Sequence, residues 1–156
     1  MKKYLCLLAV CLPLALPAFA QTADEIEMLL ETSAVTYAQA ARFTLDAANV
    51  TAAADSAQEA RWFEYAAEQN WLPKNVSAND TARLDGIALL VMRSFGMKGG
   101  MMYSFAKNPH FAYRELVYQK IIQGMTDPAM TVDGDTLLYI INRVLSQRDE
   151  AAGAGY

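Results

Sequence analysis

The sequence has only two cysteines, Cys6 and Cys11, and both fall within its first eleven residues. The opening stretch, MKKYLCLLAVCLPLALPAFA, combines two lysines, an apolar run and, at 18–20, the Ala-Phe-Ala pattern at which secretory signal peptides are cleaved. We therefore predict an exported protein whose mature chain begins at Gln21. That chain has no cysteine, so apolar burial without disulfides must hold its fold together.

An alternative processing site lies at Cys11, where a lipoprotein signal would be cleaved and acylated. Val10 is a poor residue before an acylated cysteine, and the apolar stretch ahead of it is very short. Cleavage after Ala20 is therefore favoured, and we expect the protein in the periplasm or cell envelope. No later apolar run approaches the length that crosses a bilayer, so no transmembrane span is expected after cleavage.

Basic residues and histidine are also scarce. Without the two lysines of the leader, 11 basic residues face 17 acidic ones, a net charge of about −6. Nucleic acids and anionic membrane surfaces bind basic footprints, so neither is an expected partner. His110 is the single histidine, and the acidic loop 127–135 lacks the spacing and closing glutamate of a calcium loop. We predict no metal and no cofactor.

Signatures of catalysis are missing as well. After processing there is no cysteine nucleophile, no glycine-rich phosphate loop that follows a strand, and no serine elbow. Carboxylates are numerous, but no pair stands out by its spacing. We therefore predict a non-enzymatic protein without catalytic residues. The alternative is a small glycan hydrolase, which requires a cleft that holds two acids close together.

Helix signals run along the mature chain, whereas no segment alternates apolar and polar residues for long enough to indicate a sheet. Capping residues predict six helix starts, at Thr22, Thr36, Ser56, Asp80, Asn108 and Asp133. Helix ends are expected at Asn49, Pro73, Gly96 and Gly124. The predicted fold class is all-α, a compact array of repeated helical hairpins with about five to six helices.

The chain also repeats itself with a period of 50 residues. Shifted by that distance, residues 61–95 lie over residues 111–145 without a gap, and their apolar positions coincide. Identities are few, among them Arg93 on Arg143. A partial third copy, TYAQAARFTLDAA from Thr36, matches the second helix of each unit. We therefore predict a duplicated hairpin preceded by half a copy.

The predicted domain organisation follows from the leader and these copies. It comprises a signal peptide (1–20), a short N-terminal helix (21–35), one helical domain (36–148) and a flexible tail (149–156). Within the helical domain we expect a half-repeat at 36–49 and full repeats at 55–96 and 105–146.

The copies share features with a known family. QKIIQGMTDPAMTV is similar to the turn and ten-residue loop of the family repeat. TYAQAARFTLDAA is similar to the helix of that repeat that begins Thr-Arg-Ala-Glu. Arg93 and Arg143 fall where this helix carries a late arginine. From Thr36 to about Leu145 the chain thus resembles S-layer homology repeats. The resemblance implies an all-α domain that binds a cell-wall polysaccharide.

The Thr-Arg-Ala-Glu motif is altered in all three copies. The corresponding residues read TYAQ at 36–39, RLDG at 83–86 and DGDT at 133–136, so none keeps the arginine. In the family this arginine binds an anionic substituent of the glycan. A charge-assisted hydrogen bond of this kind is among the stronger contacts that a site offers. We therefore expect weak or absent binding to anionic wall polysaccharide.

The segment MRSFGMKGGMMYSF, residues 92–105, is unusually apolar for a connection between helices. In one interpretation Met101, Met102, Tyr103 and Phe105 pack between the repeats as core, because methionine fills irregular gaps. In the other, residues 96–105 form an apolar lip that binds a peptide or an acyl chain. On the following helix, Arg114 and its neighbouring glutamate are expected to form an ion pair inside the bundle.

The expected function is a non-catalytic binding or assembly module of the cell envelope that engages wall glycan or an envelope protein. The alternative is a periplasmic adaptor that binds proteins through the 96–105 connector. Trp62 is a further candidate because an indole ring can stack on a sugar, although tryptophan is more often buried. The binding residues expected from the sequence are Tyr37, Gln39, Trp62, Met101, Met102, Tyr103, His110 and Arg114.

Overall fold

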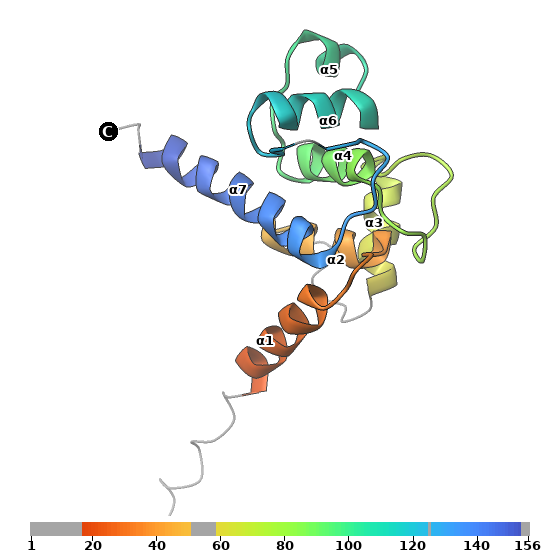
Figure 1. Cartoon of the computed structure of the whole chain (residues 1–156), viewed down its shortest axis with the longest axis vertical. Helices are drawn as coiled ribbons and strands as arrows, with labels where there is room; N and C mark the ends of the chain where they lie inside the picture. Colours follow the sequence, from red (N-terminus) through yellow and green to blue (C-terminus); the bar gives the residue numbers. More distant parts are fainter. Residues whose placement is uncertain (1–16, 51–58, 125, 154–156) are drawn as a thin grey trace, which may run out of the picture.

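The computed structural model describes residues 17–50, 59–124 and 126–153 (Figure 1). These residues form seven helices and no strand: α1 (Pro17–Leu30), α2 (Tyr37–Ala47), α3 (Glu59–Glu68), α4 (Leu84–Ser94), α5 (Met101–Phe105), α6 (Pro109–Tyr118) and α7 (Gly134–Gly153). The predicted all-α class is confirmed. Both cysteines, most of the leader and the helix start predicted at Ser56 lie outside the described residues.

The helix pairs α3–α4 and α6–α7 are built alike, fifty residues apart. Their first helices begin at 59 and 109, and their second helices at 84 and 134. The second residue past each first helix has left-handed backbone, Asn70 at φ 56° and Lys120 at φ 59°. The next amides, of Trp71 and Ile121, donate back into the helix at 2.9 Å. The same left-handed turn therefore ends both first helices.

Three extended segments meet at the centre of the fold. Val35 precedes α2, Ala82 precedes α4 and Val132 precedes α7, and all three are fully buried. The N–H of Val35 donates to the carbonyl of Val132 (2.8 Å), that of Ala82 to Val35 (2.8 Å), and that of Val132 to Ala82 (3.1 Å). This closed ring satisfies buried peptide groups and holds three helix starts around one point.

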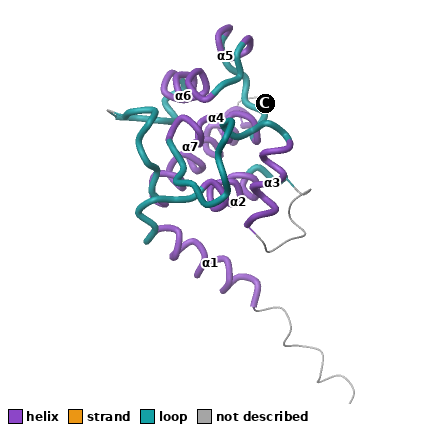
Figure 2. The backbone as a smooth tube through the Cα atoms, turned by 90° about the vertical axis from the view of Figure 1, so that its right-hand side faces the viewer, coloured by secondary structure: helices purple, strands orange, loops and turns teal. Residues whose placement is uncertain are grey.

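Apolar side chains from every layer of helices form one core around α4. Helix α4 packs mainly on α6, α2 packs on α3, and α1 contacts α7 (Figures 1 and 2). The core includes Leu45, Ile87, Leu116, Leu137 and Ile141. Burial of such a side chain stabilises a fold by about 1.5–3 kcal/mol. Helix α1 extends from one side of the molecule, and α5 lies at the opposite end (Figure 2).

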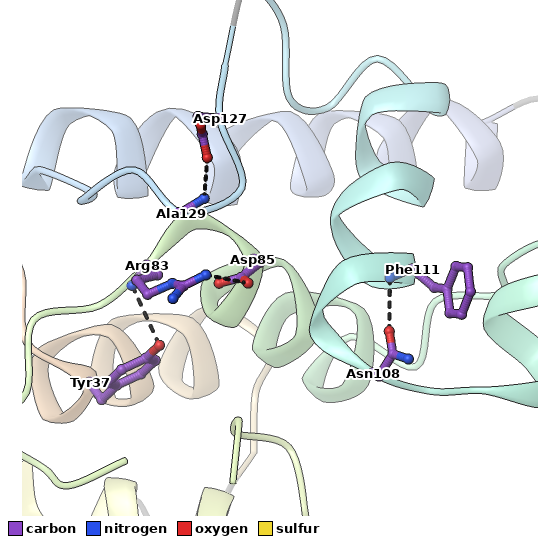
Figure 3. A network of polar contacts seen from close by, with 7 residues as sticks. All are labelled: Tyr37, Arg83, Asp85, Asn108, Phe111, Asp127 and Ala129. Atoms are coloured by element: carbon purple, nitrogen blue, oxygen red, sulfur yellow. Dashed lines mark hydrogen bonds and ion pairs between the residues drawn. The ribbon is translucent and has the colours of Figure 1, made fainter. Parts of the chain in front are cut away.

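Three predicted capping residues are confirmed: Thr36, Asn108 and Asp133. Each side chain accepts a hydrogen bond from the backbone N–H three residues further on, at 3.2, 3.0 and 2.8 Å; Figure 3 shows the bond of Asn108. Hydrogen bonds from Thr136 lower the pKa of the Asp133 carboxyl. The left-handed exits predicted at Asn49 (φ 55°) and Gly96 (φ 60°) are also present.

The start of α4 differs from the prediction. Asp80 does not cap this helix, because its carboxylate accepts a hydrogen bond from the N–H of Ser77 at 2.7 Å in the preceding loop. That hydrogen bond lowers the pKa of Asp80. Arg83 occupies the N-cap position instead, without a capping hydrogen bond from its side chain.

Other helix boundaries also differ. Helices α3 and α6 end well before Pro73 and Gly124, at the left-handed turns described above. Helix α1 begins at Pro17, upstream of the start predicted at Thr22, and α7 continues to Gly153 within the predicted tail. Helix α5 was not among the predicted elements, because its five residues are too few to show a helical period.

Candidate functional site

A groove of about 640 Å³ lies between the end of α1, the loop that follows α6 and the first half of α7. We call it the α7 groove. Its apolar lining includes Leu30, Leu84, Met130 and Ile140, and its polar lining includes Gln123, Thr126, Asp135, Thr136 and Asn142. Tyr139 contributes an aromatic ring that is 45% exposed. The groove thus combines an apolar floor with polar groups at its rim, as small-molecule sites do.

The side chains of this groove suit a sugar ring. An aromatic face such as that of Tyr139 packs against the C–H groups of a pyranose. Carboxylate and amide oxygens accept hydrogen bonds from hydroxyl groups, and amide nitrogens donate to them. Asp135 and Asn142 project these groups from α7, and Gln123 projects one from the facing loop. The arrangement can therefore hold a polyhydroxylated ring on both its apolar and its polar side.

The fifty-residue relation between the hairpins explains why Asp135 is available. In the first hairpin, the guanidinium group of Arg83 pairs with the carboxylate of Asp85 at 3.0 Å (Figure 3). In the second hairpin, Asp133 stands in the place of Arg83 and Asp135 in the place of Asp85. Asp135 consequently forms no ion pair within the described ranges. Its carboxylate remains able to accept hydrogen bonds from a ligand.

Three of the residues expected to bind ligand make structural contacts within the fold. Tyr37 is 2% exposed and packs against Gly86, and its hydroxyl accepts a hydrogen bond from the N–H of Arg83 at 3.4 Å (Figure 3). Burial raises the pKa of this hydroxyl. Gln39 completes the capping box of α2, and Trp62 lies in the core. None of these three lines the α7 groove.

The apolar connector divides between surface and interior. Tyr103 is 4% exposed, whereas Met101 is 76% and Met102 is 64% exposed. The expectation that these residues and Phe105 pack as core holds for Tyr103. It is wrong for both methionines and for Phe105, which is 86% exposed. Tyr103 is the buried residue of α5. The helix itself lies at one end of the molecule (Figure 1).

The structure does bring four of the expected residues together. Met101, Met102, Tyr103 and Arg114 line a hollow of about 410 Å³ between α5 and α6, which we call the α5 hollow. His110 is exposed at the start of α6, outside this hollow, with its ring edge-on to Phe111.

The predicted ion pair of Arg114 inside the bundle is wrong. Arg114 is exposed, and Glu115 instead accepts hydrogen bonds from the N–H of Gly100 (2.8 Å) and the side chain of Gln119 (2.9 Å). Adjacent residues on a helix point in different directions, which separates the two charges. Glu115 thus fixes the connector onto α6.

Within the described ranges, no group of three or more His, Cys, Asp or Glu residues is placed to hold a metal ion. None of the helices described is long and apolar enough to cross a membrane.

The residues of the α7 groove were not singled out from the sequence. Tyr139 and Asn142 lie beside the apolar stripe of α7, where a sequence shows only exposed helix positions. Gln123 and Thr126 belong to the loop after α6 and line the same groove, and this placement depends on tertiary packing. The one available signal was the exchange of Arg83 for Asp133 between aligned copies.

Comparison of the chain with known protein families, with curated proteins and with solved structures finds no significant match.

Proposed function

We propose that the protein is a non-catalytic binding module of the cell envelope whose α7 groove holds an uncharged saccharide. The observation that carries this proposal is the placement of Tyr139, Asp135 and Asn142 around one groove with an apolar floor. These groups offer a stacking surface, an acceptor and an amide to the same ring.

The charge of the groove supports an uncharged ligand. Asp135 is the one carboxylate among its lining residues, and no lysine, arginine or histidine lines it. An anionic sugar would therefore meet a negative charge without a compensating cation. A glycoside hydrolase uses a pair of carboxylates, so the single acid also supports binding rather than hydrolysis.

The central ring joins the three copies that resemble S-layer homology repeats. Val35, Ala82 and Val132 stand directly before the three altered Thr-Arg-Ala-Glu positions, and their mutual hydrogen bonds place three helix starts around one centre. The α7 groove adjoins the third of these starts, through Asp135 and Thr136. A site at this position agrees with the glycan role that the resemblance implies.

Isothermal titration with oligosaccharides released from purified envelope polysaccharide tests the proposal. The uncharged fraction should bind wild-type protein, and Tyr139→Ala or Asn142→Ala should weaken binding by about tenfold or more. Tyr118→Ala is the matched control, because this tyrosine is 83% exposed on α6, away from the groove. Equal binding by Tyr139→Ala and wild type, with circular dichroism showing both folded, would remove the groove from consideration.

The envelope location rests on the leader alone. Intact mass of the protein isolated from the producing cell tests it, because the cleavage that we predict leaves a chain that begins at Gln21. A mass that includes acyl chains on Cys11 would show that the protein is anchored by lipid rather than released as a free exported chain.

A protein partner at the connector is a second candidate, favoured by the exposure of Met101, Met102, Phe105 (86%) and Tyr118 (83%) around α5 and α6. Clustered exposed apolar side chains mark interaction surfaces. The double variant Met101→Ser/Met102→Ser should lose capture of envelope proteins while it retains saccharide binding. Unchanged capture by this variant would leave the connector without a binding role.

A further inference from the structure

A cavity of about 320 Å³ at the C-terminal end of α4 is lined by Trp71, Arg93, Gly96, Met97, Tyr103 and Lys107. Two of these six residues are cations and none is an acid, in a chain where acids outnumber bases by 17 to 13. The cavity is separate from the α7 groove, with which it shares no lining residue.

Two polar groups of the cavity are buried without a partner. Tyr103 is 4% exposed, yet its hydroxyl has no hydrogen-bond partner among the described residues, and neither has the buried Nε of Arg93. Burial raises the pKa of the Tyr103 hydroxyl, and the charge of Arg93 acts on it in the opposite direction. Both residues line the same cavity. Buried donors of this kind are normally satisfied, so two of them in the lining of one cavity favour an acceptor there.

Glu115 does not supply that acceptor. Its charge reaches Tyr103 and raises the pKa of the hydroxyl further. Its carboxylate oxygens, however, accept hydrogen bonds from the N–H of Gly100 and the amide of Gln119, and it lines the α5 hollow rather than this cavity.

The second hairpin shows what the same arginine does when it is structural. Arg143 lies fifty residues after Arg93, and its guanidinium group donates to the carbonyl of Lys120 at 3.0 Å, at the left-handed turn after α6. The matching carbonyl in the first hairpin belongs to Asn70, and no hydrogen bond joins it to Arg93 within the described part of the chain. The Nε atoms of both arginines are buried without a partner among the described residues. Arg143 is nevertheless held at a turn through its Nη2, whereas Arg93 lines the cavity.

The aromatic wall of the cavity is held in position. Trp71 stands where the second hairpin has the fully buried Ile121, and its ring meets that of Tyr65 edge to face at 5.7 Å between centroids. A partly exposed indole beside two cations offers a surface for a flat ring that carries a negative group.

We propose that this cavity binds a small organic anion that carries a carboxylate or phosphate group on a flat ring. Arg93 and Tyr103 donate hydrogen bonds to the anionic oxygens, Lys107 adds positive charge at the mouth, and Trp71 packs against the ring. The proposal is independent of saccharide binding in the α7 groove.

Isothermal titration calorimetry in a low-salt buffer tests it with three probes: benzoate, phenyl phosphate and benzamide. Benzamide has the shape of benzoate without its charge. We expect at least one of the two anions to bind, and benzamide to bind about tenfold or more weaker. Comparison of benzoate with phenyl phosphate identifies which anionic group the site prefers. Failure of both anions to bind at about 10 mM, or equal binding of benzoate and benzamide, would overturn the proposal.

Variants locate the site. Arg93→Gln should weaken binding of the anion by about tenfold or more. Tyr103→Phe, which removes only the hydroxyl, should weaken this binding severalfold. Arg143→Gln is the matched control and should leave affinity unchanged, since it removes the same charge from the equivalent position of the other hairpin. Lys107→Gln, at an exposed residue, provides a folded variant if Arg93→Gln lowers stability. Equal losses in Arg93→Gln and Arg143→Gln would contradict the assignment.

Discussion

The Cα atom of Gly134 lies directly against the main-chain carbonyl of Leu29, so a β carbon at this position would overlap the carbonyl oxygen. This contact joins the first turn of α7 to the last turn of α1. The N–H of Gly134 strengthens it by donating to the carbonyl of Thr32 at 2.9 Å. Because α1 and α7 form two walls of the α7 groove, this glycine sets their separation.

Gly134→Ala should therefore lower the free energy of unfolding by about 1–3 kcal/mol, the usual cost of overpacking. The neighbour is backbone rather than a flexible side chain, so it cannot turn aside. Gly153→Ala on the same helix is the control, because nothing lies within 4 Å of its added β carbon. Urea unfolding measures both. A Gly134→Ala variant as stable as wild type would show that α1 does not pack on α7 in this way.

The cap of α7 gives a second prediction. Asp133→Ala should destabilise the protein by about 1 kcal/mol, because its side chain accepts a hydrogen bond from the N–H of Thr136 at the helix start. Asp149→Ala removes the same group from the far part of α7 and should change stability little. Equal effects of the two substitutions in urea unfolding would argue against the cap.

The same carboxylate makes stability depend on pH. The folded-state pKa of Asp133 is lowered, so its stabilisation is fully present above the unfolded value of about 3.9 and is lost as the pH falls through the folded value. Asp133→Asn keeps an acceptor at the cap but cannot titrate. Between pH 7 and pH 3, its urea midpoint should fall less than that of wild type. Parallel losses would show that other carboxylates account for the acid sensitivity.

The core position of α7 gives a fourth prediction. Ile141 is 4% exposed, so Ile141→Ala should cost about 2–5 kcal/mol of unfolding free energy. Val117→Ala is the comparison, since Val117 is 40% exposed on α6. This substitution should lower the free energy of unfolding much less. Thermal or urea unfolding measures the difference. A loss below about 0.5 kcal/mol at Ile141 would place this side of α7 outside the core.

The connector gives a fifth prediction. Met101→Ser/Met102→Ser should remain folded, with a change in stability within about 0.5 kcal/mol per residue, because both side chains are exposed. Tyr103→Ser should clearly lower the free energy of unfolding, since the ring of Tyr103 is buried. Circular dichroism melting compares the two variants. Unfolding of the double methionine variant would restore the interpretation of the connector as core.

Local sequence rules account for much of the fold. Thr36, Asn108 and Asp133 cap their helices as predicted, because capping depends on residues only three positions apart. Asp80 was assigned wrongly since its carboxylate has a nearer partner in Ser77, three residues earlier and outside any helix. Local signals of equal strength thus compete, and only the folded chain shows which one prevails.

The candidate sites were less predictable than the helices. Tyr37 and Trp62 were chosen for their chemistry, but burial decides whether an aromatic ring meets a ligand, and both are buried. The α7 groove arises where residues distant in sequence, such as Leu30 and Asn142, meet across a loop. Helical periodicity describes one element at a time and carries no information on such meetings.

The central claim is that an uncharged saccharide occupies the α7 groove, and a ¹H–¹⁵N NMR titration with the uncharged oligosaccharide fraction tests it most directly. Saturable shift changes should cluster at the amides of Gln123, Asp135, Tyr139 and Asn142, and should be absent from Met101 at the other end of the molecule. Shift changes confined to α5 and α6, or none at saturating saccharide, would contradict the account.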